Sequence, residues 1–88
     1  MSTPKWLKDY YGEQFDSFHP ELIVDGRKFA IVRIYQPQAS RQMYHSIGYV
    51  LLRKGGRHEG VSHQSLHEGV PNQADMDRMK AVLQKADA

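Results

Sequence analysis

Three observations predict an α+β domain: an antiparallel sheet of three or four strands with an N-terminal and a C-terminal helix, in the order α-β-β-β-(β)-α. An Asp25-Gly26 pair separates two runs of β-forming residues, which is the pattern of a β-hairpin. Apolar residues recur at helical spacing before Pro20 and again after Asn72. Strands grouped between terminal helices are typical of the α+β class.

The first helix is expected over about residues 4–17. Thr3 offers a side-chain oxygen as N-cap, and Pro4 suits the first helical position because its missing N–H needs no partner. Pro20 ends the helix, since a residue before proline avoids helical geometry. One face of this helix is rich in aromatic residues and consists of Leu7, Tyr10, Tyr11, Phe15 and Phe18.

The hairpin joins a strand over residues 22–24 to a strand over residues 28–35. Asp-Gly between two strands predicts a type I′ turn, in which both central residues take positive φ. This two-residue turn would place Val24 opposite Arg27 and Leu22 opposite Phe29. A polar loop over residues 36–42 follows, because Pro37 would interrupt a central strand.

A third strand is expected over about residues 43–53, followed by a turn at Lys54 to Arg57 and a short, weak fourth strand over residues 61–66. The closing helix is expected over residues 73–86. Asn72 is a good N-cap, and acidic residues come early in this helix and lysines late, which suits the helix dipole. Its narrow apolar stripe consists of Met76, Met79, Leu83 and Ala86.

The composition limits the function classes. The 88 residues, opening at Met1, predict one complete domain over residues 1–88. The chain has no cysteine, which excludes disulfides, thiolate metal ligands and a cysteine nucleophile, and favours a cytoplasmic location. It shows no apolar run of membrane-spanning length and no signal peptide. No residue pattern names a reaction, so we expect no enzyme, no cofactor and no metal.

The predicted strands are apolar on two sides. Phe29 and Ile31 point one way, while Ala30, Val32 and Ile34 point the other. A half-exposed antiparallel sheet alternates apolar with polar residues, so both faces of this sheet must be covered. One helix on each face would achieve that. Alternatively, both helices share one face, and the other face meets a second subunit or a partner protein.

The second arrangement predicts a small regulatory or inhibitory protein that binds another protein, as a homodimer, of the type carried by phages or mobile elements. Its binding residues would be Trp6, Tyr10 and Tyr11, because the aromatic helix carries more rings than one face can bury and Trp and Tyr are favoured at binding hot spots.

The alternative is a nucleic-acid-binding domain. Arg53, Lys54 and Arg57 surround a Gly-Gly turn, and Arg41 and Tyr44 lie in or near the middle loop. Basic and aromatic side chains together can bind phosphates and stack on bases. The net charge is only +2, so such binding would depend on where the charges gather. Four further residues of this kind lie near the two hairpin turns and the middle loop: Arg27, Lys28, Arg33 and Tyr35.

The histidines allow a third hypothesis, a small ribonuclease with His58 as general acid or base. His58, His63 and His67 lie close in sequence, but glycines nearby argue against the helix that would make His63 and His67 zinc ligands. The tail, with Gly56-Arg57-His58 and a closing helix, resembles the HicA toxin ribonucleases, which implies a fold like a double-stranded-RNA-binding domain. The likeness covers the last third only, and Gly-Arg-His replaces the family's Gly-Ser-His, so we do not assign the chain to that family.

Overall fold

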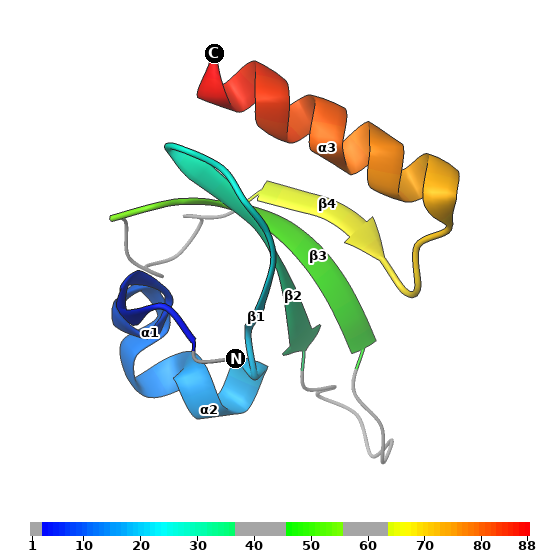
Figure 1. Cartoon of the computed structure of the whole chain (residues 1–88). Coiled ribbons are helices and arrows are strands. Elements are labelled where there is room, and N and C mark those ends of the chain that lie inside the picture. Colours follow the sequence, from blue (N-terminus) through cyan, green and yellow to red (C-terminus); the bar gives the residue numbers. More distant parts are fainter. Residues whose placement is uncertain (1–2, 37–45, 56–63) are drawn as a thin grey trace.

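The computed structural model describes residues 3–36, 46–55 and 64–88 and confirms the α+β class. An N-terminal helical segment is followed by four strands and a long C-terminal helix (Figure 1). The elements are α1 (Lys5–Tyr11), a 3₁₀ turn η1 (Gly12–Gln14), α2 (Phe15–Phe18), β1 (Glu21–Asp25), β2 (Phe29–Gln36), β3 (Ser46–Arg53), β4 (Gln64–Glu68) and α3 (Gln73–Asp87).

The four strands form one antiparallel sheet in the order β1-β2-β3-β4, so strands that follow each other in sequence are also neighbours in space. The fourth strand is present over Gln64–Glu68 and extends two residues beyond its predicted end at residue 66. Residues 61–63 of its predicted range lie outside the described residues. The third strand begins at Ser46, and residues 43–45 of its predicted range lie outside the described residues. The end of β1, the start of β2 and the end of β3 therefore lie at the same end of the sheet.

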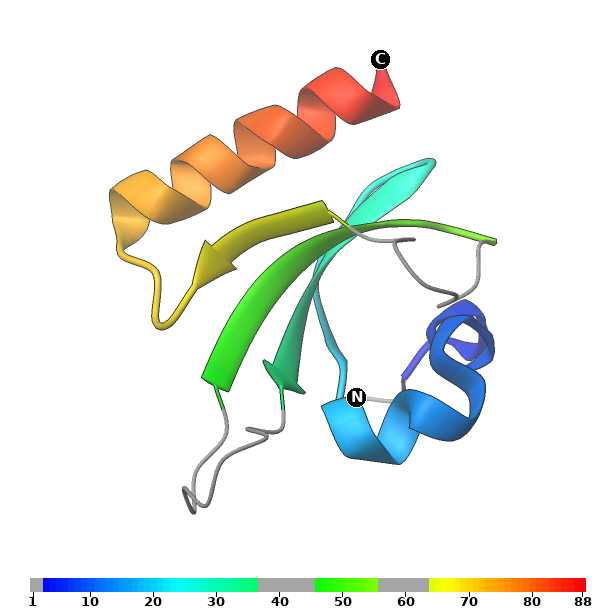
Figure 2. The same cartoon turned by 180° about the vertical axis from the view of Figure 1, so that it is seen from behind.

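Helices lie on both faces of the sheet, giving three layers (Figures 1 and 2). On the face of α1 and α2, the buried residues are Leu7, Tyr10, Tyr11, Val32, Ile34, Val50 and Leu52. On the face of α3, the buried residues are Ile31, Tyr49, Leu51, Met79 and Leu83. Consecutive residues of β2 and β3 therefore alternate between two cores, which explains why these strands are apolar on both sides.

The sheet thus needs no second subunit to remove its apolar faces from water. Of the two arrangements that the sequence allowed, the structure shows the one with a helix on each face. Within residues 3–36, 46–55 and 64–88, the exposed large hydrophobic residue is Val70, on the connection between β4 and α3. A single exposed valine is ordinary for a protein surface and marks no docking patch.

The N-terminal helical segment covers residues 5–18, close to the predicted 4–17, but it is broken by the 3₁₀ turn η1. It begins after Pro4, which is itself the N-cap with φ of -59° and ψ of 145°, so the prediction of Thr3 as the cap was wrong. Gly12 has φ of +54° and ends α1, because this left-handed conformation is accessible mainly to glycine. The chain then turns through η1 into α2, and His19, also left-handed, ends the segment before Pro20.

The predicted type I′ turn is also wrong. Neither Asp25 nor Gly26 has positive φ, and Asp25 pairs with Ala30 rather than with a residue directly after the turn. The strands pair Val24 with Ile31, and the register shifts by one residue between Leu22 and Val24. The connection therefore has three residues, Gly26 to Lys28, and its shape is set by contacts with the end of α3 that are described below.

Helix α3 begins where the sequence predicted. The amide of Asp75 donates to Asn72 Oδ1 at 2.8 Å, and the amide of Asn72 donates to Asp75 Oδ2 at 3.2 Å, which forms a capping box. Met79 and Leu83 of the predicted stripe are buried, and Met76 and Ala86 are partly buried beside them.

None of the helices in the described ranges is long and apolar enough to cross a membrane.

Truncation of Met79 tests whether α3 is an essential cover of the sheet. Met79→Ala is expected to lower the free energy of unfolding by about 2–5 kcal/mol, because the side chain is fully buried and its loss leaves a cavity. Urea unfolding followed by circular dichroism measures this change. Lys80→Ala, at an exposed site on the same helix, should change stability by less than about 0.5 kcal/mol. Equal stabilities of the two variants would mean that α3 is not docked as described.

Candidate nucleic-acid interface

Two loops that are distant in sequence meet at one end of the sheet. Phe29, at the start of β2, pairs with Arg53, at the end of β3. Just beyond this pair, the amide of Lys54 donates a hydrogen bond to the carbonyl oxygen of Lys28 at 2.8 Å. These contacts bring together four cationic residues, which we call the basic end: Arg27, Lys28, Arg53 and Lys54.

The four cations differ in their exposure and partners. Arg27, Lys28 and Arg53 are exposed. Lys54 is partly buried; its ammonium forms an ion pair with Asp25 and lies 5.6 Å from the centroid of the Trp6 ring, within the range of a cation–π interaction. The basic end therefore combines three exposed cations with one that is held in place against an aromatic ring.

Asp87, the last residue of α3, fixes the β1–β2 loop. Its Oδ2 accepts a hydrogen bond from the amide of Arg27 at 2.8 Å, and its Oδ1 accepts from the amides of Lys28 and Phe29, both at 2.9 Å. Figure 1 shows the β1–β2 hairpin tip beside the end of α3. These hydrogen bonds, with that from Arg27 first, lower the pKa of Asp87 because they stabilise its charged form.

Glycine is required at position 26 for this close approach. A Cβ added there would collide with Asp87 Oδ2 and with the carbonyl oxygen of Phe29, and it would lie 3.0 Å from a methyl carbon of Leu83. The requirement is thus one of space and not of positive φ. Sequence reasoning assigned Gly26 to a turn type and missed Asp87, because no local pattern connects residues that are about 60 positions apart.

A second polar feature crosses the sheet on the side of α3. Glu21, Arg33, Tyr49 and His67 are cross-strand neighbours, one from each strand, and we call them the polar row. Arg33 forms an ion pair with Glu21, and the rings of Tyr49 and His67 lie 6.4 Å apart. Burial disfavours the charge of Arg33, but nearby groups, Glu21 foremost, more than offset this effect and raise its pKa.

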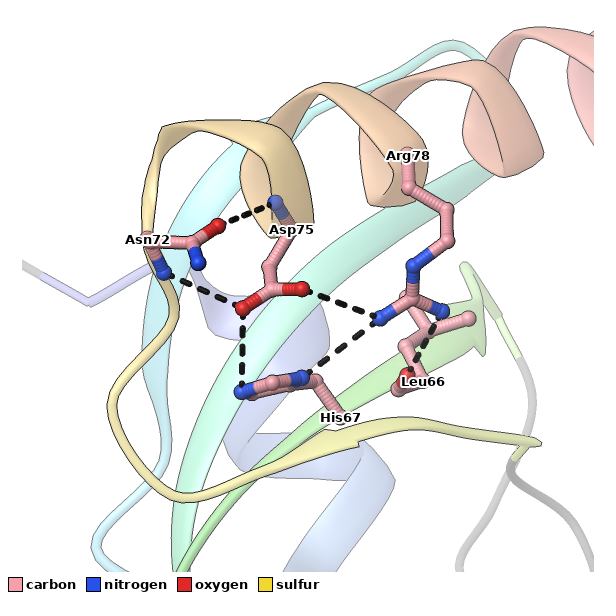
Figure 3. Close-up of polar contacts among 5 residues, drawn as sticks. All are labelled: Leu66, His67, Asn72, Asp75 and Arg78. Carbon is pink, nitrogen blue, oxygen red and sulfur yellow. Dashed lines mark hydrogen bonds and ion pairs between the residues drawn. The ribbon is translucent and has the colours of Figure 1, made fainter.

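At one end of the polar row, His67 connects β4 to α3 (Figure 3). Its Nε2 lies 3.7 Å from Asp75 Oδ2, and its Nδ1 lies 3.5 Å from a guanidinium nitrogen of Arg78. Arg78 also donates to the carbonyl oxygen of Leu66 at 3.4 Å. Both ring nitrogens of His67 thus face charged side chains of α3, Asp75 and Arg78.

The predicted protein-binding residues lie mostly in the core. Tyr10 and Tyr11 are only 2% and 3% exposed, and their rings pack edge to face with centroids 5.1 Å apart. Burial raises the pKa of Tyr11, with a smaller contribution from Tyr10. Trp6 is partly buried against the same core and beside Lys54. The two tyrosines therefore serve the fold, and of the three residues Trp6 keeps partial exposure.

The predicted nucleic-acid-binding residues are partly brought together. Arg53 and Lys54 lie side by side at the basic end, where Arg27 and Lys28 join them. Arg57, Arg41 and Tyr44 lie outside the described residues. Gln36 and Ser46, which precede and follow the segment with Arg41 and Tyr44, pair at the opposite end of β2 and β3 from Arg53.

The histidine hypotheses fall largely outside the described residues. His58, which would serve a ribonuclease, and His63 both belong to the segment between β3 and β4 that the structure leaves undescribed. Among the residues that it does describe, no group of three or more histidine, aspartate or glutamate side chains is placed to hold a metal ion.

No family model matches the chain, and no curated protein and no solved structure is significantly similar to it.

The contact between Asp87 and the loop predicts a pH dependence of stability. A carboxyl group whose pKa is lowered by folding contributes stability that is complete above its ordinary pKa of 3.8 and is lost as the pH falls through the lower folded pKa. The free energy of unfolding of the wild type should thus fall more steeply below about pH 4 than that of Asp87→Asn.

Urea unfolding at a series of acidic pH values measures this difference. Asp77→Asn removes a carboxylate from an exposed site of the same helix without touching the β1–β2 loop, so it should keep the wild-type dependence. Parallel curves for the wild type and Asp87→Asn would show that the three hydrogen bonds do not contribute to stability.

Proposed function

We propose that this chain is a non-catalytic nucleic-acid-binding domain that contacts the phosphate backbone through its basic end. The observation that supports it best is the hydrogen bond between the amide of Lys54 and the carbonyl of Lys28. This bond joins the cationic loop before β2 to the cationic segment after β3. Phosphate contacts supply most of the affinity of nucleic-acid binders that lack base-specific contacts, and lysine and arginine are the usual donors.

The acidic residues at this end support the proposal. Asp25 is paired with Lys54. Asp87 accepts hydrogen bonds from backbone amides and also interacts electrostatically with the Arg27 side chain. Among the described residues, neither of these two carboxylates forms an ion pair with Lys28 or Arg53. The net charge of +2 is small for the whole chain, but what a phosphate chain meets is the local field. At the basic end, cations outnumber carboxylates.

Trp6 adds an aromatic ring at the same end. It lies beside the Lys54 ammonium and is partly buried, so one part of the ring is fixed by the core. An ordered aromatic ring next to cations is the arrangement with which single-stranded nucleic acids are bound without sequence preference. Single-stranded RNA or DNA is therefore the form that we expect to bind best.

Salt dependence and charge removal test this function. Fluorescence anisotropy with a labelled single-stranded oligonucleotide should show binding that weakens strongly between about 50 and about 200 mM salt. A double variant, Lys28→Ala with Arg53→Ala, should lower the binding constant by about 10-fold or more. It should also reduce the slope of log binding constant against log salt concentration by up to about 2.

The matched control is Lys8→Ala with Lys80→Ala, which removes the same charge from exposed helix positions. This control should bind close to wild type. Salt-insensitive or undetectable binding by the wild type, or equal weakening in both double variants, would contradict the proposal.

Regulatory or inhibitory binding to another protein, including a homodimer, is the second candidate, now supported by a different surface. Beside the polar row, Arg33 lies 5.7 Å from the Tyr35 ring centroid, and the rings of Tyr35 and His19 lie 6.3 Å apart. Arg33 and Tyr35 are partly exposed. Arginine and tyrosine are enriched at the energetic centres of protein interfaces.

Light scattering after size exclusion tests the homodimer. A dimer mass that Tyr35→Ala converts to a monomer mass would support an interface at this surface. A monomer mass for the wild type at high concentration, about 100 μM or more, would contradict the homodimer, because a specific interface of standard size should be occupied at that concentration.

A further inference from the structure

The β1–β2 loop directs three successive backbone amides at one point, and the carboxylate of Asp87 occupies that point. We propose that this loop is a phosphate-binding site, that Asp87 is its built-in occupant in the ligand-free chain, and that a nucleic-acid phosphate displaces it. The inference rests on the proposed function and adds the site at which the backbone phosphate is held. It also makes the end of α3 an internal competitor of the ligand.

The donor set suits a phosphate group. Concave arrangements of successive backbone N–H groups are anion sites in many proteins and bind carboxylates and phosphates alike. Here the amides of Arg27, Lys28 and Phe29 donate over 2.8–2.9 Å to two oxygens of one anion. Two of these three residues, Arg27 and Lys28, also carry exposed cationic side chains. Their two positive charges exceed the single negative charge of Asp87.

The loop is held in shape by contacts other than Asp87. The carbonyl of Lys28 accepts the bond from Lys54, and Asp25 pairs with Ala30 on the other side of the loop. Gly26 lies against a methyl group of Leu83, which is itself buried. These contacts would persist if Asp87 left, so the amides would remain directed at a common point for another anion.

Asp87 can leave without opening the core. It is the last residue of α3, and the Ala88 that follows is exposed. The buried anchors of the helix, Met79 and Leu83, precede it by one turn or more. The helix beyond Leu83 contributes only the partly buried Ala86 to the core, so displacement of Asp87 costs mainly its own hydrogen bonds.

Competition by Asp87 predicts that its removal strengthens nucleic-acid binding. The apparent affinity for the nucleic acid is proportional to the fraction of molecules in which Asp87 has left the site. If Asp87 fills the site in most molecules, Asp87→Ala should raise the apparent affinity by roughly 5- to 10-fold. The variants to compare are the wild type, Asp87→Ala, Asp87→Asn and the control Asp77→Ala, which removes the same charge elsewhere on α3.

Two readouts test the inference on the full chain. Anisotropy with a labelled single-stranded RNA at fixed salt should give the tightest binding for Asp87→Ala, an intermediate value for Asp87→Asn, and a value near wild type for Asp77→Ala. In amide NMR spectra, inorganic phosphate should shift the resonances of Arg27, Lys28 and Phe29 in Asp87→Ala, while chloride at equal ionic strength should not.

The outcomes separate this inference from the proposed function. If Asp87→Ala and Asp77→Ala gain equally, the effect is one of general charge, and the site is refuted. If the wild type binds RNA through Lys28 and Arg53 but Asp87→Ala and Asp87→Asn bind no more tightly, the basic end stands and the phosphate site is wrong. Should Asp87→Ala prove unfolded, the isosteric Asp87→Asn decides by the same two readouts.

Discussion

The structure depends on the burial of a sheet that is apolar on both faces. Ile31 and Leu51 contact α3, while Val32 and Val50, one residue away on the same strands, lie in the core beneath α1 and α2. Hydrophobic burial is the main favourable term in folding, so each helix is as necessary as the sheet that it covers. This constraint places α3 on one face of the sheet, and its end lies at the β1–β2 loop.

The placement of α3 links the fold to the proposed site. Because Leu83 is buried against the sheet, Asp87 one turn later lies within hydrogen-bonding distance of the loop amides. The same loop is joined to the end of β3 by the Lys54 amide. Three segments of the chain thus meet at the basic end, and the cations there sit on a framework whose backbone positions are fixed from both sides.

The sequence predicted the elements and their class because those depend on local signals. The N-cap at Asn72 and the two-sided apolar strands are readable from neighbouring residues, and both are present. Which face each helix covers was not readable, because either helix could have satisfied either face. The turn type at Gly26 was wrong for a related reason: long-range contacts with Asp87 and Leu83 outweigh the local preference of an Asp-Gly pair.

The site shows the same division. Arg53 and Lys54 were chosen from their place beside a turn, and the meander topology does unite them with Arg27 and Lys28. Tyr10 and Tyr11 were chosen because the N-terminal helix carries more rings than one face can bury and because tyrosine is favoured at hot spots. Hot-spot preferences and core preferences overlap for tyrosine, and both rings lie in the core. Asp87 carried no sequence signal at all, since its role depends on a contact that only the folded chain creates.

The measurement that tests the central claim most directly is an amide NMR titration of the wild-type chain with a short single-stranded RNA. The basic end predicts that the largest chemical-shift changes fall on the β1–β2 loop and on the end of β3, at Arg27, Lys28, Arg53 and Lys54, and that they diminish with added salt. Changes centred instead on Arg33, Tyr35 and the polar row, or no changes at any salt concentration, would contradict it.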